Sequence, residues 1–188
     1  MSLQATTWQT VGPYFRIGLE HLDSAQMAPP GTAGQHVTIK GQVLDGNGQP
    51  VPDAVIEIWQ ASAAGKYASA TEEPRRARGE GFQGFGRIPT DAEGRFSFAT
   101  IRPGPVPGPK GKQQSPHLAV RVMMRGLLKG LVTRMYFPTE SLSNDPVLSL
   151  VPEQRRGTLI AELSKDREET YLWNVELQGE RETVFFDC

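Results

Sequence analysis

Short runs in which apolar and polar residues alternate recur through most of the chain. One run begins near residue 36, where Val37, Ile39, Gly41 and Val43 alternate with polar neighbours. Alternation with a period of two is typical of a β-strand with one buried face, because successive side chains point to opposite faces. The same reasoning predicts further strands over residues 55–60, 95–101, 118–124, 131–137, 157–163, 170–177 and 183–186.

Turn-forming residues separate these runs. The chain has 20 glycines and 15 prolines, and many of them fall between the apolar segments, as in the Asp-Gly-Asn-Gly stretch at residues 45–48. Asparagine and glycine tolerate the positive φ of tight turns. No helical stripe of useful length competes, apart from a short helix predicted near residues 147–150. The sequence therefore predicts an all-β fold, an antiparallel β-sandwich with short helical segments in loops.

The chain is expected to form a single domain, residues 37–188, preceded by an irregular N-terminal arm, residues 1–36. Pro13, Pro29 and Pro30 interrupt any long element in the arm, and residues 9–15 form a compact aromatic stretch. Two interpretations of the arm stay open, since it can pack on its own domain or reach into a partner.

Charge and cysteine content exclude some classes of partner. Lysine and arginine number 20 against 21 acidic residues, for a net charge of −1. This balance argues against nucleic acid or an anionic membrane as a main partner, because both select basic surfaces. No apolar run is long enough to span a bilayer. Cys188 is the sole cysteine, so no internal disulfide can form, and we expect a cytoplasmic protein.

One predicted strand resembles a metal-binding strand that lacks a ligand. His117 stands where a His-x-His pair would begin, and Ala119 takes the second position. Two histidines two residues apart on a strand share a face and can hold one metal ion, whereas histidine and alanine cannot. We therefore expect that this chain binds no metal itself.

A series of motifs resembles the intradiol ring-cleavage dioxygenases. The blocks follow the order of that family and cover most of residues 9–187. Within the family the similarity is greatest to a chain type that lacks iron, and it is carried by the two ends of the chain, residues 9–14 and 179–187. The other blocks are residues 41–45, 56–61, 65–67, 90–96, 101–105 and 133–137.

The resemblance implies a damaged ligand set. In the family, Fe(III) is held by two tyrosinates and two histidines. The first tyrosine position is filled by Tyr67, and the second, in a Pro-Gly-Pro-x-Pro block, by Val106. The first histidine position is filled by His117 and the second by Ala119. Neither valine nor alanine can donate to a metal, so the four positions are interpreted as vestigial.

The resemblance also implies a role for a chain without iron. It would pair with a homologous iron-bearing beta chain in an alpha–beta hetero-oligomer, and Fe(III) would sit on that partner. This chain would supply one wall of a pocket for protocatechuate, which is cleaved with O₂. The implied substrate-binding residues are Gly12, Pro13, Tyr14 and Arg125.

Arg125 is the most specific of these predictions. An arginine pairs strongly with a carboxylate such as the one that protocatechuate carries. The residues alone favour an ordinary solvated loop arginine, and only the resemblance favours substrate contact. If the strand continued past residue 124, Arg125 would share a face with His117 and Ala119 and could point toward the vestigial ligand positions.

Two other functions remain open from the sequence. One is a self-sufficient intradiol dioxygenase with unusual ligands. The other, from a different class, is a non-enzymatic β-sandwich binding module of the transthyretin-like kind. The iron content of the purified chain separates the first from a subunit without iron, and co-purification with a homologous catalytic chain separates the second.

Overall fold

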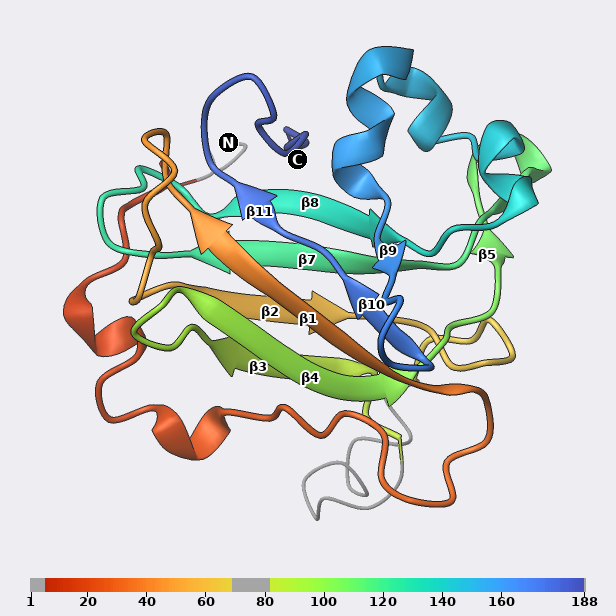
Figure 1. Cartoon of the computed structure of the whole chain (residues 1–188), viewed down its shortest axis with the longest axis horizontal. Helices are drawn as coiled ribbons and strands as arrows, with labels where there is room; N and C mark the ends of the chain where they lie inside the picture. The colour runs from red at the N-terminus through yellow and green to blue at the C-terminus, as the bar shows by residue number, and fades with distance from the viewer. Residues whose placement is uncertain (1–5, 69–81, 188) are drawn as a thin grey trace, which may run out of the picture.

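The computed structural model describes residues 6–68 and 82–187, and these residues form two β-sheets that lie one over the other (Figure 1). The first sheet is built around β1 (His36–Leu44), with β4 (Arg95–Ile101) antiparallel along it. β10 (Thr170–Leu172) and β11 (Val175–Glu176) pair in parallel with successive parts of β1. β9 (Glu162–Leu163) pairs antiparallel with β10.

The second sheet is antiparallel throughout. Its order is β3 (Phe85–Pro89), β2 (Val55–Trp59), β7 (His117–Met123) and β8 (Leu131–Tyr136). With the first sheet it confirms the all-β sandwich that the alternating pattern predicts, although the parallel pairings of β1 depart from a wholly antiparallel arrangement.

The remaining elements are short and lie in the connections. β5 (Val106–Pro107) and β6 (Gln113–Gln114) form a small hairpin just before β7. The helices are single turns or little more, of the 3₁₀ type. They are η1 (Pro13–Phe15), η2 (Glu20–Leu22), η4 (Pro109–Gly111), η5 (Glu140–Asn144), η6 (Leu148–Leu150) and η7 (Glu153–Leu159).

The main core lies between the two sheets. Alternate residues of each strand are buried there, and the other face of the strand points away. On β7, for example, Leu118, Val120 and Val122 are buried in the core. This alternation fixes the register, because a shift by one residue would turn His117 and Ala119 into the core and these aliphatic side chains out of it. Other members of the core are Val37, Ile39, Val43, Ile56, Ile58, Ile88, Phe96, Phe98, Met135, Phe137 and Trp173.

Gly41 lies on the alternating face of β1, where two neighbours pack directly against its backbone. A Cβ atom built at Gly41 would lie 1.8 Å from the carbonyl oxygen of Trp173 and 2.5 Å from Cζ of Phe96. Both distances are shorter than any real non-bonded contact, so only glycine fits between these neighbours. The close approach lets Trp173 donate its backbone N–H to the carbonyl of Lys40 at 2.9 Å.

The C-terminal third differs most from the prediction. The expected strand over 157–163 begins as the end of η7, and only Glu162–Leu163 is extended as β9. β9 pairs antiparallel with β10, which forms the first part of the strand expected over 170–177. The expected strand over 183–186 is reduced to one bridge between Phe186 and Val132. The short helix near 147–150 is confirmed as η6.

The N-terminal arm packs on its own sandwich over part of its length. Met27 and Ala28 are fully buried, and the backbone of Ala99 exchanges hydrogen bonds with Ala25 and Met27. Ser24 donates its N–H to the carbonyl of Arg87 on β3. This part of the arm therefore joins the edges of the two sheets, while the division into an arm and a single domain at residue 36 stays a prediction.

No helix within the described ranges is long and apolar enough to cross a membrane. The basic cluster of Arg75, Arg76 and Arg78 and the cysteine Cys188 lie outside the residues that the structure describes.

Candidate functional site

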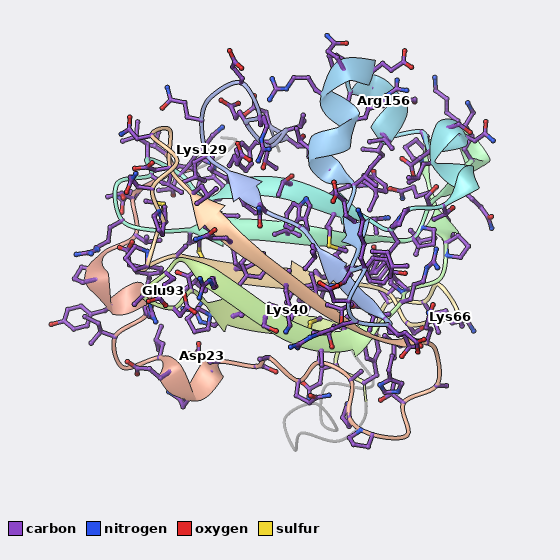
Figure 2. The ribbon with its side chains drawn as sticks, in the orientation of Figure 1. Asp23, Lys40, Lys66, Glu93, Lys129 and Arg156 are labelled. Carbon is purple, nitrogen blue, oxygen red and sulfur yellow. The ribbon has the colours of Figure 1, made fainter. Side chains whose placement is uncertain are left out.

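The residues singled out from the sequence fall into two groups at opposite ends of β7. His117 begins this strand, whereas Arg125 comes two residues after its end. Figure 2 shows Lys66, the neighbour of Tyr67, on the right side of the molecule and Lys129, in the connection that carries Arg125, on the left side. The condition under which Arg125 would face the vestigial ligand positions is not met, because β7 ends at Met123, before residue 124.

The vestigial ligand positions, Tyr67, Val106, His117 and Ala119, form the first group, at the end where β7 begins. His117 and Ala119 share the face of the sheet opposite the core, as their spacing predicts. Val106 pairs with Gln114 in the β5–β6 hairpin, which directly precedes β7 in the chain. The turn before Tyr67 packs against Pro105, the residue before Val106. A Cβ atom built at Gly65 would lie 2.1 Å from the carbonyl oxygen of Pro105.

His117 is held as a neutral imidazole. Its side chain is buried, and Nδ1 donates a hydrogen bond of 2.8 Å to the carbonyl oxygen of Ser115. A carbonyl can only accept, so the proton of the neutral ring is on Nδ1. Burial lowers the pKa of His117, and the nearby charge of Arg134 lowers it further, against the opposing effects of the Ser115 bond and Asp145.

Tyr67 is held as a neutral phenol. Its side chain is about half exposed, at 45%. Partial burial raises the pKa of Tyr67, and the charge of Arg134 opposes this effect without cancelling it. In the metal-free chain at neutral pH Tyr67 is therefore a phenol, whereas the ligand in the family is a tyrosinate.

This end of the sheet does not fit a metal ion. Val106 is buried and apolar, and Ala119 offers only a methyl group. Within residues 6–68 and 82–187 no three histidine, cysteine, aspartate or glutamate side chains come together as a possible metal site. Two donors, His117 and Tyr67, are fewer than the three or four protein ligands that metal sites of this kind use.

Sequence reasoning missed the residues that organise this end. Arg134 on β8 donates through Nη1 to Oε1 of Gln114 at 2.6 Å and to the hydroxyl of Tyr136 at 3.4 Å. Tyr136 in turn donates to Asp145 at 3.2 Å. The available signal was the alternation of β8, which puts Arg134 and Tyr136 on the face of His117, but the register of the hairpin cannot be read from the sequence.

A cleft of about 730 Å³ opens beside these residues. Its lining includes Pro105, next to Val106, and Ser115, the residue that holds His117. The other lining residues are polar or small, namely Lys112, Gln113, Gln114, Pro116, Thr139, Ser143, Asn144 and Ser149.

The second group consists of Gly12, Pro13 and Tyr14, at the tip of the arm, and Arg125, in the turn after β7. Arg16 donates through Nη1 to the carbonyl of Pro52 at 2.9 Å, and Arg125 donates through Nε to Oδ2 of the next residue, Asp53, at 2.5 Å. Val11 lines the same small hollow as Met123, Met124, Leu127 and Lys129. The arm and the Arg125 turn are therefore anchored to adjacent residues.

The side chains presented by this second group are free of the core. Tyr14 is 76% exposed as a residue, and the side chain of Arg125 is 68% exposed. The backbone beneath Tyr14 is nevertheless fixed, because Arg87 donates to the carbonyl oxygen of Phe15 while also pairing with Glu57 at 2.9 Å. An aromatic ring and a guanidinium are groups that can contact an aromatic carboxylate, and here both are exposed.

Two further histidines do not join either group. His21 and His36 are exposed and lie outside the family motifs. His36 bonds the carbonyl of Thr32 at 2.8 Å, a local contact within the end of the arm.

Comparisons with known proteins agree with this architecture. A family model described as Dioxygenase matches residues 11–179. The protocatechuate 3,4-dioxygenase alpha chain of Burkholderia cepacia is 40% identical over 201 aligned positions, covering 99% of this chain and 98% of the relative. The beta chain from the same organism is 36% identical over 154 positions, covering 78% of this chain and 66% of that relative. The crystal structure of 3-chlorocatechol 1,2-dioxygenase from Rhodococcus opacus 1CP shares the fold, with a TM-score of 0.64 at 20% identity over 94% of this chain and 69% of that one.

Proposed function

This chain belongs to the intradiol dioxygenase family, a family of oxidoreductases, and from that premise we propose that it is the alpha chain, without iron, of a protocatechuate 3,4-dioxygenase. Together with an iron-bearing beta chain it would cleave protocatechuate between the two hydroxylated ring carbons. O₂ is the co-substrate, and 3-carboxy-cis,cis-muconate is the product. Fe(III) on the partner would activate the bound catecholate toward O₂.

One observation carries the proposal. The end of the sheet that would hold iron has lost donors at Val106 and Ala119, yet the arm tip and Arg125 are presented to solvent on a fixed backbone at the other end. A chain that held its own iron would need the first region intact. A chain that completes a partner's pocket needs only the second, so the pattern favours a contribution across an interface.

The chemistry assigned to Arg125 is recognition of the substrate carboxylate. The bond to Asp53 uses Nε, so Nη1 and Nη2 remain to make charge-assisted hydrogen bonds. Asp53 sets the direction of the guanidinium before substrate arrives. Tyr14 would lie against the aromatic ring or donate its hydroxyl, and Gly12 with Pro13 would set the course of the arm that carries it.

The partner proposed here is a homologous chain with an intact ligand set. The match to a beta chain over 78% of this chain supports a partner of the same fold, and the names of these relatives support an alpha–beta hetero-oligomer. A cytoplasmic location belongs to the proposal, since a catabolic enzyme with one cysteine needs no oxidising compartment.

The test is to purify the chain alone and with its iron-bearing partner, and to measure iron by metal analysis and visible absorption. The chain alone is expected to be colourless, because tyrosinate–Fe(III) charge transfer gives the family its burgundy colour. The complex is expected to contain one iron per alpha–beta pair and to turn over protocatechuate. One iron per chain in the isolated protein would contradict the proposal and support a self-sufficient dioxygenase instead.

A further inference from the structure

Arg134 stands directly beside the position of a missing ligand. Ala119 on β7 and Arg134 on β8 are Cα partners across the two strands, as are His117 and Tyr136. Residues opposite each other in an antiparallel pair share a face, with Cβ atoms about 4.5–5.5 Å apart. The methyl group of Ala119 thus leaves room on this face, and the neighbouring long side chain is a cation.

Hydrogen bonds fix the guanidinium of Arg134 at this place. Nη1 is bonded to Gln114 at 2.6 Å, and Gln114 is the strand partner of Val106, the other position without a donor. The same Nη1 lies 3.4 Å from the hydroxyl of Tyr136, the cross-strand partner of His117. Arg134 is therefore tied to the neighbours of three of the four ligand positions.

Among the described residues the charge of Arg134 has no directly paired carboxylate, and the buried Asp145 is joined to it through the hydroxyl of Tyr136. No aspartate or glutamate oxygen of the described ranges forms an ion pair with Arg134 within 4.0 Å. The fixed charge therefore lies on the strand face that carries His117 and Ala119.

We propose that Arg134 bars metal from this chain, because its guanidinium holds a fixed positive charge opposite Ala119 and against the strand partners of Val106 and His117, at three of the four positions from which the family holds a cation. The inference deepens the proposed function and rests on it in taking these four positions as the former ligand set. Its consequence is that the missing donors alone are not what prevents iron binding. Restoring both donors leaves a like charge next to the incoming metal.

The experiment restores the ligands with and without Arg134 in the full chain. One protein carries Val106→Tyr and Ala119→His, a second adds Arg134→Gln, and a third adds Arg134→Lys instead. Each is loaded with iron, passed through gel filtration to keep the folded fraction, and assayed by metal analysis and tyrosinate–iron absorption. Circular dichroism checks the fold.

The protein with Arg134→Gln is expected to bind iron about a hundredfold more tightly than the one with both ligands and Arg134, because a unit charge within several ångströms of a metal acts through a low local dielectric. The protein with Arg134→Lys keeps the charge and is expected to bind as weakly as the one with Arg134. Equal binding by all three proteins, equal binding by the Lys and Gln versions, or no binding by any of them would overturn the proposal.

A second comparison covers the case in which a tyrosine at the buried position of Val106 disturbs the fold. Ala119→His alone, with and without Arg134→Gln, is titrated with Co²⁺ and followed by its visible absorption. Two imidazoles on one strand face bind Co²⁺ measurably when no like charge opposes it. Affinity that does not rise on removing Arg134 would contradict the proposal. The proposed function is judged separately, by iron in the unaltered chain.

Discussion

Asp53 holds the guanidinium of Arg125 through a bond of 2.5 Å from Nε to Oδ2, although the two residues are 72 positions apart in the chain. The pair is exposed on the arginine side, where the side chain is 68% accessible. An exposed ion pair contributes little to stability, because solvent screens the two charges. The pair is therefore better explained as a device that orients Arg125 than as one that holds the fold.

Arg125→Ala in the assembled complex is expected to impair substrates that carry a ring carboxylate. A charge-assisted hydrogen bond is worth about 1.5–3 kcal/mol, so kcat/KM for protocatechuate should fall by roughly tenfold to a hundredfold. Unsubstituted catechol has no carboxylate and should be affected little. The measurement is the ratio of kcat/KM for the two substrates in variant and parent.

A matched control for this variant is Arg181→Ala. Arg181 is also an exposed arginine paired with an acid, Glu176, but it lies near the C-terminus. Its loss should leave the substrate ratio unchanged, and neither variant should change the iron content of the complex. A ratio that Arg125→Ala leaves at the parent value would show that Arg125 does not bind the carboxylate.

Tyr14→Ala is expected to lower turnover without unfolding the chain. Since Tyr14 is 76% exposed as a residue, it adds little to the core, whereas a ring packed on substrate contributes enough for a loss of about tenfold in kcat/KM. Tyr14→Phe separates the ring from the hydroxyl. Ile17→Ala, also on the arm and 59% exposed, is the control.

Removal of residues 1–15 extends the same test to the whole tip. The deletion removes none of the strands that the structure describes, so circular dichroism should still show the sandwich, while turnover of the complex should be lost. Full turnover by the truncated complex would mean that the tip only packs on its own chain.

The strands could be predicted because their signal is local. Alternation along residues 118–124 suffices to separate Leu118 from His117, and no distant partner is needed to see it. The parallel pairings of β10 and β11 with β1 could not be predicted, because they depend on which strand lies beside which. The same limit explains the strand expected over 157–163, where local pattern favoured extension but η7 packs Leu159 into a separate small cluster with Tyr136.

The candidate site likewise has features that can be predicted from the sequence and features that cannot. The loss of donors at Val106 and Ala119 is visible in the sequence, since each stands in a recognisable block. The contacts that give the site its charge and direction are not visible, because Arg134 with Gln114 and Arg125 with Asp53 join residues from different strands or turns. The sequence thus shows which positions lack a metal donor, but it does not show which contacts Arg134 and Arg125 make in the fold.

The stability of the full chain is expected to fall as the pH drops below about 6.5, in part because of His117. Burial, with Arg134, lowers the pKa of His117 in the folded state. The unfolded state keeps the ordinary value near 6.5 and takes up the proton first, so acid favours unfolding until the folded pKa is also passed. One such group contributes at most about 1.4 kcal/mol per pH unit.

The measurement is the free energy of unfolding by urea at pH values from about 7 down to about 5. His117→Gln removes the titrating group, so its stability should decline less steeply than that of the parent. His21→Gln, at an exposed position, serves as the control and should follow the parent. Parallel curves for parent and His117→Gln would contradict the expectation.

Asp145 is the residue whose loss should cost the fold most at this end of the molecule. It is fully buried, and Oδ2 accepts from the N–H of Ser115 at 2.6 Å. Oδ1 accepts from the N–H groups of Val147 and Leu148 and from the hydroxyl of Tyr136. Asp145→Ala leaves several buried donors without an acceptor and is expected to destabilise the chain by at least about 3 kcal/mol.

Asp145→Asn distinguishes the two oxygens. Its remaining carbonyl oxygen can still serve the three donors that meet at Oδ1, but its NH₂ group would face the N–H of Ser115, donor against donor. We therefore expect a smaller loss, about 1–3 kcal/mol. The free energy of unfolding of both variants decides the point. If Asp145→Asn costs as much as Asp145→Ala, the negative charge of the carboxylate, and not its count of acceptors, stabilises this network.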